Sequence, residues 1–319
     1  MPSCLQKEIE ALSIIFRTIL SHKKFGLYCI MDNKTISRLI YPSRTTEDIV
    51  LDFYQLSLFR GEPKNKCRVG ADFVNFFTHP ERLNTIGREG ISFIEFINNK
   101  NGCLEKRYVQ RMLDFYDCEP IEREVWILYR IFNLYFGAIS IFQPHIAVSL
   151  FDRFKPKCVL SPCAGWGGLV TGACAAGVPR WIGCDSNPEL IKPYELMIET
   201  LNKHSLTKID MRYGDCLKLP YAEMEYDMVL YSPPFYNIEQ YNGQPLRQRH
   251  EWNHFYIVLC ELSWQHLQVG GWYCVAVSNE IYDIYKEIIG RVADYVVGMP
   301  NKKRHEFHKY GENIFCWKK

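Results

Sequence analysis

Two short motifs in the second half of the chain contain the residue types that a group-transfer reaction needs. The first is a glycine-rich turn at residues 161–168, which reads Ser-Pro-Cys-Ala-Gly-Trp-Gly-Gly. Glycines allow positive φ angles and let a ligand approach the backbone closely. The second is the tetrapeptide Ser232-Pro233-Pro234-Phe235. Its two prolines stiffen the backbone and carry no N–H, so their carbonyl groups can be held facing a substrate.

Two carboxylates follow the turn, each at the end of an apolar run. Asp185 lies about twenty residues after the turn, where an acidic side chain accepts hydrogen bonds from ribose hydroxyls. Asp215 ends the next run and is expected to accept the amino group of an adenine ring. The structural alternatives are a helix cap at Asp185 and a turn residue at Asp215. The turn reads Gly-x-Gly-Gly, not Gly-x-Gly-x-x-Gly, which favours S-adenosylmethionine over a nicotinamide cofactor.

Short apolar runs alternate with helix-length segments from residue 157 onward, which predicts a parallel sheet covered by helices on both faces. Only a polar loop separates the last two runs, so these should form an antiparallel hairpin. The expected fold is α/β, with a seven-stranded, mostly parallel, Rossmann-like sheet that ends in this hairpin. The runs occupy residues 157–161, 180–185, 209–213, 227–231 and 271–277, the helices 168–176, 188–204, 252–267 and 280–292, and the hairpin 293–298 and 313–317.

The composition changes near residue 140, before which the pattern is mainly helical and aromatic. We therefore expect a mainly helical N-terminal region over residues 1–140 and a catalytic domain over residues 141–319. The N-terminal region is expected to recognise the target, to form a lid, or to bind a partner protein. The apolar segment 126–142 contains Arg130 and is shorter than the ~20 residues of a membrane span, so it predicts a buried helix and no membrane partner.

Bulk composition excludes few functions. The formal net charge of +2 does not indicate a nucleic-acid partner, so any basic surface must be local. The 13 cysteines include no Cys-x-x-Cys pair, and we expect no metal site. Reduced thiols and the absence of a secretory leader pattern predict an intracellular, reducing compartment.

The tetrapeptide after the fourth run resembles the signature of class I S-adenosylmethionine-dependent amino-methyltransferases, (Asp/Asn/Ser)-Pro-Pro-(Tyr/Phe/Trp). The resemblance covers residues 140–319, and the fuller pattern is similar to methyltransferases of large DNA viruses and phages. It implies methylation of an exocyclic base nitrogen in DNA, either cytosine N4 or adenine N6. A serine in the first position is associated more with cytosine N4. A viral protein would act in the host cytoplasm or nucleus.

The resemblance also implies roles for individual residues. The Ser232 hydroxyl and the Pro233 carbonyl would orient the target amine beside Pro234, and Phe235 would stack on the base, which must leave a duplex. Cys163 lies in the cofactor turn, so we do not expect it to be a nucleophile. The implied cofactor-binding set is Phe142, Gln143, Pro144, Ser161, Pro162, Ala164, Gly165, Gly167, Asp185, Ser186, Asp215, Cys216 and Ser232.

A long polar loop follows the tetrapeptide and is expected to contact the substrate. Tyr236 and Tyr241 could stack on bases, and Arg247 and Arg249 could meet phosphates; the alternative is a solvated loop. Other substrates remain open, namely RNA or a glutamine side chain. A catalytically silent subunit that binds nucleic acid or a partner is a further alternative. Ser232 argues against glutamine, whose methyltransferases usually carry Asn-Pro-Pro-Tyr, and the intact motifs argue against a silent subunit.

Overall fold

The structure, a computed structural model, describes residues 31–41, 45–62, 67–116, 121–137, 139–240, 246–298 and 312–319. The described residues form two compact units. The first unit is drawn from residues 1–43 and 80–139, and the second from residues 44–79 and 140–319. The boundary predicted at residue 140 therefore leaves out the 44–79 stretch, which packs with the second unit.

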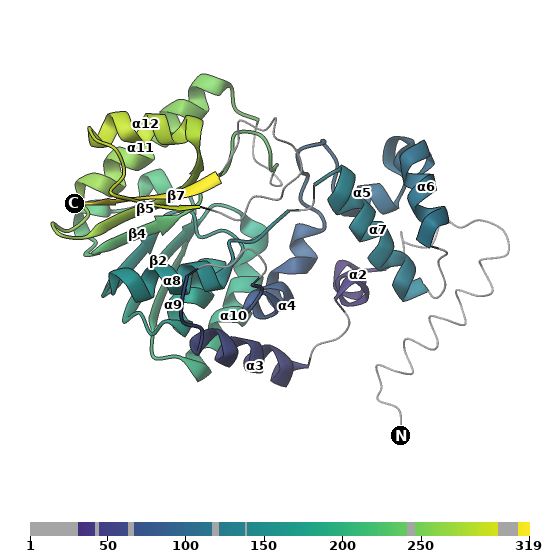
Figure 1. The fold of residues 1–319 in the computed structure, drawn as a ribbon, viewed down its shortest axis with the longest axis horizontal. Coiled ribbons are helices and arrows are strands. Elements are labelled where there is room, and N and C mark those ends of the chain that lie inside the picture. The colour runs from purple at the N-terminus through teal and green to yellow at the C-terminus, as the bar shows by residue number, and fades with distance from the viewer. Residues whose placement is uncertain are drawn as a thin grey trace. The chain divides into compact units, whose positions relative to one another are not determined.

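The second unit is built on a seven-stranded sheet (Figure 1). Its strands are β1 (Cys158–Ser161), β2 (Arg180–Asp185), β3 (Lys208–Tyr213), β4 (Met228–Tyr231), β5 (Trp272–Ser278), β6 (Tyr295–Gly298) and β7 (Glu312–Lys318). The strand order is β3-β2-β1-β4-β5-β7-β6, with β1 to β5 paired in parallel and β7 antiparallel to both β5 and β6. This is the class I methyltransferase arrangement, and it confirms the predicted sheet and its terminal hairpin.

Helices cover both faces of this sheet, with α11 and α12 on one side and α8, α9 and α10 on the other (Figure 1). All eight residues of α9 are buried. A helix that is apolar on every side needs cover on every side, and α9 contacts β2, α8 and α3. These helices are α3 (Thr46–Ser57), α8 (Pro144–Phe154), α9 (Gly168–Ala175), α10 (Ile191–His204), α11 (Arg249–Gln265) and α12 (Asn279–Ile289).

Residues 44–79 belong to the second unit, and α3 in this stretch packs on α8 and α9. The same stretch begins α4 (Ala71–Arg82), whose start is capped by a side chain from α3. The Asp52 carboxylate accepts hydrogen bonds from three backbone N–H groups at this helix start, at 2.9–3.0 Å. Negative charge is stabilising at a helix N-terminus, so α3 and the beginning of α4 are joined as one structure.

The first unit is a helical cluster around aromatic rings. Phe93, Phe96, Phe132 and Phe136 are buried, with the ring centroids of contacting pairs 5.0–6.2 Å apart. Offset and edge-to-face contacts of this kind stabilise a small core beyond the area that they bury. The elements of this unit, apart from the end of α4, are α2 (Asn33–Ile40), α5 (Phe93–Ile97), η2 (Lys100–Glu105), α6 (Arg107–Tyr116) and α7 (Ile121–Tyr135).

The apolar segment predicted as one helix over residues 126–142 is helical only as far as Tyr135. Gly137 has a φ of 79°, and its N–H donates to the Phe132 carbonyl at 3.1 Å. A glycine in this left-handed conformation ends a helix and satisfies one of its last carbonyls. In the described part of the chain, no helix combines the length and apolar character that a membrane crossing requires.

A buried tyrosine network lies directly behind the tetrapeptide and should be measurable in stability. The Tyr231 hydroxyl lies 2.7 Å from that of Tyr273 and 2.9 Å from that of Tyr285. We expect Tyr231→Phe to lower the free energy of unfolding by about 1–3 kcal/mol, because buried hydroxyls lose a partner. Urea denaturation measures this loss. Tyr54→Phe is the control, because the Tyr54 hydroxyl forms an exposed hydrogen bond with His204. A loss no larger than that of Tyr54→Phe would contradict the prediction.

Candidate cofactor and substrate site

The glycine turn and the tetrapeptide leave the sheet at the same edge, from adjacent strands. β1 pairs with β4, and the Ser161 hydroxyl donates to the Leu230 carbonyl at 2.7 Å. The turn after Ser161 therefore begins beside Ser232, the first residue after β4. Ligands of open parallel sheets bind at this carboxyl edge. The two motifs are thus placed where one ligand site can use both.

Three contacts fix the shape of the glycine turn. The Gly165 N–H donates to the Asp185 carboxylate at 2.8 Å. The Tyr194 hydroxyl donates to the Gly165 carbonyl at 3.0 Å, and the Thr78 hydroxyl donates to the Trp166 carbonyl at 3.1 Å. Backbone groups on both sides of the turn are therefore held by side chains from α4, β2 and α10, which leaves a preformed loop for a ligand.

Asp185 ends β2, and one carboxylate serves two parts of the site. One oxygen accepts the Gly165 N–H and the other accepts the Asn187 N–H at 3.0 Å. Burial raises the pKa of Asp185 to about 6, while these hydrogen bonds act in the opposite direction. The group is therefore ionised at neutral pH. A carboxylate has about four lone-pair positions, so Asp185 can still accept hydrogen bonds from a ligand.

Open space and unpartnered polar atoms border this turn. A methyl group added at Gly165 or Gly214 would meet no heavy atom within 4 Å. Gln143 Oε1 and Asn187 Nδ2 are buried without a hydrogen-bond partner among the described residues. Buried polar atoms of this kind need a partner. The residues present therefore fit a ligand that carries both hydrogen-bond donors and acceptors.

The predicted segment Phe142-Gln143-Pro144 packs directly on the glycine turn. A methyl group added at Gly168 would lie 1.9 Å from the Phe142 carbonyl oxygen, so only glycine allows this approach. Gln143 stands at the N-cap of α8, but its side chain makes no capping hydrogen bond. Its amide is therefore available to a ligand at the edge of the turn.

This close approach makes Gly168 sensitive to substitution. Gly168→Ala should lower the free energy of unfolding by about 3 kcal/mol, because the obstructing atom is a backbone carbonyl that cannot rotate away. Gly290→Ala is the matched control, since a methyl group there meets nothing within 4 Å. It should cost only about 1 kcal/mol, from its φ of 78°. Urea unfolding compares them, and equal losses would contradict the close packing of Phe142 on the turn.

Asp215 lies beside Asp185 at the same sheet edge. The Gly214 N–H donates to the Asp185 backbone carbonyl at 2.9 Å, and the exposed Asp215 carboxylate accepts the Leu217 N–H at 3.0 Å. Ser186 is also exposed, next to Asp185. The structure thus brings the two predicted carboxylates together, and Asp215 also has the turn role that the sequence left open.

Some predicted cofactor residues face the interior instead. Ser161 is fully buried, and its hydroxyl donates to Leu230 and accepts from the Trp181 indole at 3.1 Å. Its side chain therefore joins neighbouring strands, and the predicted contact of Ser161 with the cofactor stays a prediction. A hydrogen bond with Cys216, together with burial, raises the pKa of Cys163 well above its usual value. That thiol stays protonated at neutral pH, which agrees with its exclusion as a nucleophile. Pro162 and Ala164 are buried as well.

The tetrapeptide presents two acceptors. The Ser232 hydroxyl donates to the Ala276 carbonyl at 3.3 Å, which leaves its oxygen lone pairs to accept from a substrate. The Pro234 carbonyl accepts the Tyr256 hydroxyl at 2.8 Å, and the Pro233 carbonyl remains as the second acceptor. Phe235 is half-buried, so one part of its ring can face a ligand.

The predicted substrate loop is partly engaged within the second unit. The Arg249 guanidinium lies 3.6 Å from the Tyr236 ring centroid and forms an ion pair with Glu280. Arg247 lies over the Trp252 ring at 4.8 Å. These two arginines pack on aromatic rings and do not project freely, so their contact with phosphates stays a prediction. Tyr241 lies outside the described residues.

The structure adds four residues that the sequence analysis did not single out, namely Thr78, Asn187, Tyr194 and Tyr256. Thr78 and Tyr194 hold the turn from distant helices, and no local pattern places those helices there. Asn187 carried a usable signal, since it follows Asp185 by two residues in Asp-Ser-Asn-Pro. Tyr256 lies on the buried face of α11 and looked like an ordinary core residue.

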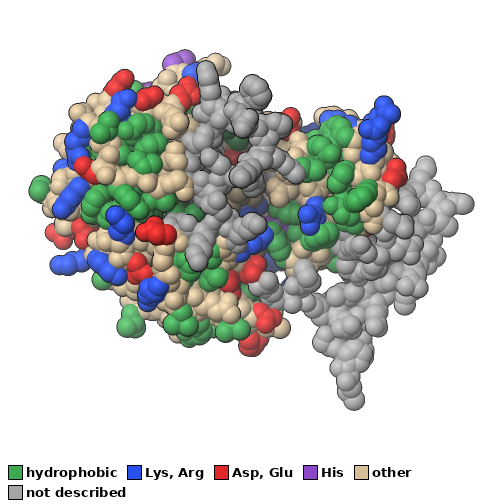
Figure 2. All heavy atoms as spheres, viewed as in Figure 1, with side chains coloured by type: hydrophobic (Ala, Val, Ile, Leu, Met, Phe, Trp, Pro, Cys, Tyr) green, Lys and Arg blue, Asp and Glu red, His purple; other side chains and the backbone are tan. Residues whose placement is uncertain are grey.

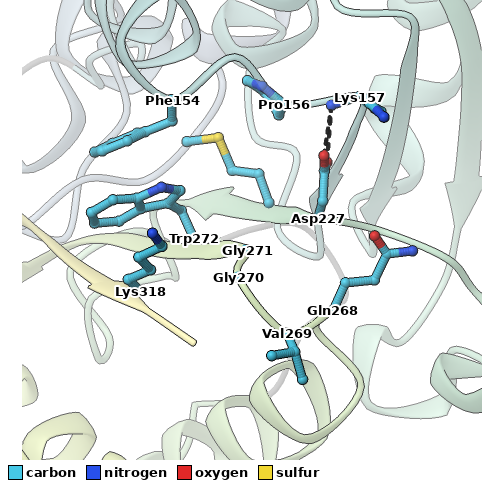
Figure 3. A pocket seen from close by; sticks show the side chains of 11 residues that line it. Phe154, Pro156, Lys157, Asp227, Gln268, Val269, Gly270, Gly271, Trp272 and Lys318 are labelled. Atoms are coloured by element: carbon cyan, nitrogen blue, oxygen red, sulfur yellow. Dashed lines mark hydrogen bonds between the residues drawn. The ribbon is translucent and has the colours of Figure 1, made fainter.

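A cavity also lies elsewhere in the second unit, away from the glycine turn and the tetrapeptide. A cavity of about 430 Å³ lies at the opposite edge of the sheet, where β1, β4 and β5 begin (Figure 3). There the Asp227 carboxylate accepts the backbone N–H groups of Lys157 and Cys158 at 2.8–3.0 Å.

On the face of this unit drawn in Figure 2, basic and acidic side chains are interspersed. Among the described residues, no group of three or more His, Cys, Asp or Glu could hold a metal ion.

The sequence matches no protein-family model, and it matches no curated protein. Solved structures resemble about half of the chain. TrmN from Thermus thermophilus is 19% identical with a TM-score of 0.39, covering 56% of this chain and 49% of TrmN. TehB from Haemophilus influenzae is 15% identical with a TM-score of 0.38, covering 59% and 66%. NSun6 from Pyrococcus horikoshii, solved with SFG, is 12% identical with a TM-score of 0.41, covering 56% and 52%.

Proposed function

We propose that the protein transfers a methyl group from S-adenosylmethionine to an exocyclic base nitrogen in DNA, either cytosine N4 or adenine N6. The observation that carries the proposal is the position of Ser232-Pro233-Pro234-Phe235. It leaves β4 beside the glycine turn that leaves β1. A substrate amine held by the tetrapeptide would therefore meet a cofactor held by the turn.

The cofactor would be held along the carboxyl edge of β1, β2 and β3. Asp185 would accept the ribose hydroxyls, Asp215 the adenine amino group, and Gln143 a donor from the methionine part. The open backbone at Gly165 would allow close approach. When bound, S-adenosylmethionine supplies an electrophilic methyl group on a sulfonium; the target nitrogen takes the methyl, the thioether keeps the bonding electrons, and one proton leaves the nitrogen to solvent.

The tetrapeptide would activate the amine by position. An exocyclic amine is a poor nucleophile because its lone pair is delocalised into the ring of the base. Hydrogen bonds from its two N–H groups to the Ser232 hydroxyl and the Pro233 carbonyl would favour a tetrahedral nitrogen with an available lone pair. Fixed acceptors of this kind lower a barrier by orientation and electrostatics. Phe235 would stack on the base once it has left the duplex.

One labelling experiment separates this proposal from its alternatives. The protein is incubated with tritiated S-adenosylmethionine and, in separate reactions, DNA, RNA and protein pools, followed by nucleoside analysis of the labelled product. We expect label in DNA, as N4-methylcytosine or N6-methyladenine. Label found only in RNA, or only in glutamine side chains of the protein pool, would show that DNA is not the substrate. No binding of S-adenosylmethionine by calorimetry would favour a silent subunit. Ser232→Ala is the negative control, because it keeps the cofactor turn and removes one amine acceptor.

A further inference from the structure

The residue that follows the tetrapeptide has an unusual backbone conformation. Tyr236 has a φ of 48°, which a residue with a bulky side chain rarely adopts. Such a conformation persists only where surrounding contacts hold it, and it is typical of functional sites. The contacts that hold it here come largely from one side chain on α11.

That side chain is Tyr256, whose hydroxyl bonds on both sides of Phe235. It donates to the Pro234 carbonyl at 2.8 Å and accepts the Tyr236 N–H at 3.0 Å. Tyr256 is fully buried, and its ring stacks on that of Trp252 with centroids 5.9 Å apart. The hydroxyl is therefore fixed by a packed helix. A phenol is suited to this place because it donates and accepts at one atom.

The rings reinforce this connection. The Tyr236 ring meets the Tyr256 ring edge-on, with centroids 5.5 Å apart at 87°. On Tyr236 lies Arg249, which is ion-paired to Glu280 at the start of α12. The segment after the tetrapeptide is thus attached to α11 at two places. Tyr256 contacts it through its hydroxyl and its ring, and Arg249, at the start of α11, packs on the Tyr236 ring.

These contacts determine where the acceptors of the tetrapeptide point. Each proline fixes φ near −65°, so the segment has few free torsions. When Tyr256 holds the Pro234 carbonyl, the few remaining torsions restrict the direction of the neighbouring Pro233 carbonyl, and Phe235 is fixed between two bonded neighbours.

We propose that Tyr256 is a positioning residue that holds the tetrapeptide so that the Pro233 carbonyl and the Phe235 ring receive the target base. This rests on the proposed function. Tyr256 does not touch the reacting atoms; it acts through Pro234 and Tyr236. Removal of its hydroxyl frees both groups and leaves the glycine turn unchanged.

Tyr256→Phe tests the proposal, with Tyr226→Phe as matched control. Tyr226 is also fully buried in the second unit, and its hydroxyl donates to the Ser263 carbonyl at 2.9 Å, away from the tetrapeptide. Each variant loses one buried bond from a tyrosine hydroxyl to a backbone carbonyl. We expect Tyr256→Phe to lower kcat on the order of 100-fold, the loss typical of a small misplacement of reacting groups. The Kd for S-adenosylmethionine should stay at the wild-type value in both variants, which also shows that the fold is retained.

Amide hydrogen exchange of the Tyr236 N–H, followed by mass spectrometry of peptides that contain it, gives a readout independent of turnover. Exchange at this amide should be faster in Tyr256→Phe and unchanged in Tyr226→Phe. Wild-type exchange in Tyr256→Phe would overturn the proposal, and so would faster exchange with wild-type kcat. If the wild-type protein methylates no pool, the proposed function fails, and the exchange still decides whether Tyr256 holds this segment.

Discussion

Asp185→Ala should lower the affinity for S-adenosylmethionine at least about 100-fold, as measured by calorimetry. Hydrogen bonds to charged groups contribute about 1.5–3 kcal/mol each, and the variant loses two to the ribose. It also loses the acceptor that fixes the Gly165 N–H, so the turn itself loosens. Both effects act in the same direction, which makes this the largest single effect that we expect on cofactor binding.

Asp227 offers a matched control at the opposite edge of the same sheet. Like Asp185, it accepts two backbone N–H groups, but these belong to residues at the start of β1 (Figure 3). Asp227→Ala should reduce stability and leave the Kd for the cofactor unchanged. If the two variants weakened binding equally, Asp185 would act only by maintaining the fold.

Cofactor affinity should also depend on pH through the same carboxylate. Burial raises the pKa of Asp185 to about 6, so the group is ionised above that pH and protonated below it. The protonated form must use one oxygen as a donor, and it loses acceptor positions for the ribose. We therefore expect the affinity to fall as the pH drops through about 6, approaching tenfold per pH unit. This pH dependence of the affinity should be absent in Asp185→Ala. Calorimetry between pH 5 and 8 measures it in both proteins, and the same dependence in the variant would contradict the prediction.

Phe235→Ala should lower kcat/KM for the nucleic-acid substrate by about 10- to 100-fold, because stacking on a base contributes about 1–3 kcal/mol. The cofactor Kd should not change, since Phe235 follows β4 and not the glycine turn. Phe235→Trp is the informative companion, because it keeps an aromatic face and should retain most of the activity. Single-turnover methylation assays measure both. Loss of activity in Phe235→Trp equal to that in Phe235→Ala would mean that the ring only fills space.

The centre of the sheet in the second unit was readable from the sequence because β1, β2, β4 and β5 are short runs with mostly buried residues. Residues 180–185 match β2 in full, and residues 227–231 include the whole of β4. Turn residues mark the ends of such runs clearly, and burial on both faces removes any alternating pattern that could be confused with a surface strand. The positions of the glycine turn and the tetrapeptide at the ends of β1 and β4 were readable for the same reason, since each follows directly from one of these runs.

The contacts between distant segments were not readable. Nothing near Thr78 in the sequence indicates that its hydroxyl bonds to Trp166, 88 residues later. Ser161 looked available to a ligand, but its hydroxyl is used between Trp181 and Leu230, which only the pairing of the strands brings near. A single sequence shows local periodicity and turn residues. It does not show which helices and strands from distant parts of the chain pack against each other.

The assignment of residues 44–79 to the second unit changes how the protein can be dissected. A fragment that began at residue 140 would keep every strand and both motifs, but it would lack α3, which covers part of α9. Because α9 has no polar side, such a fragment would present an apolar helix to water and would be expected to aggregate. A recombinant second unit that deletes residues 80–139 and restores the connection with a flexible linker would keep that cover. The second unit is therefore better isolated by removing the internal segment 80–139 than by truncating the chain at residue 140.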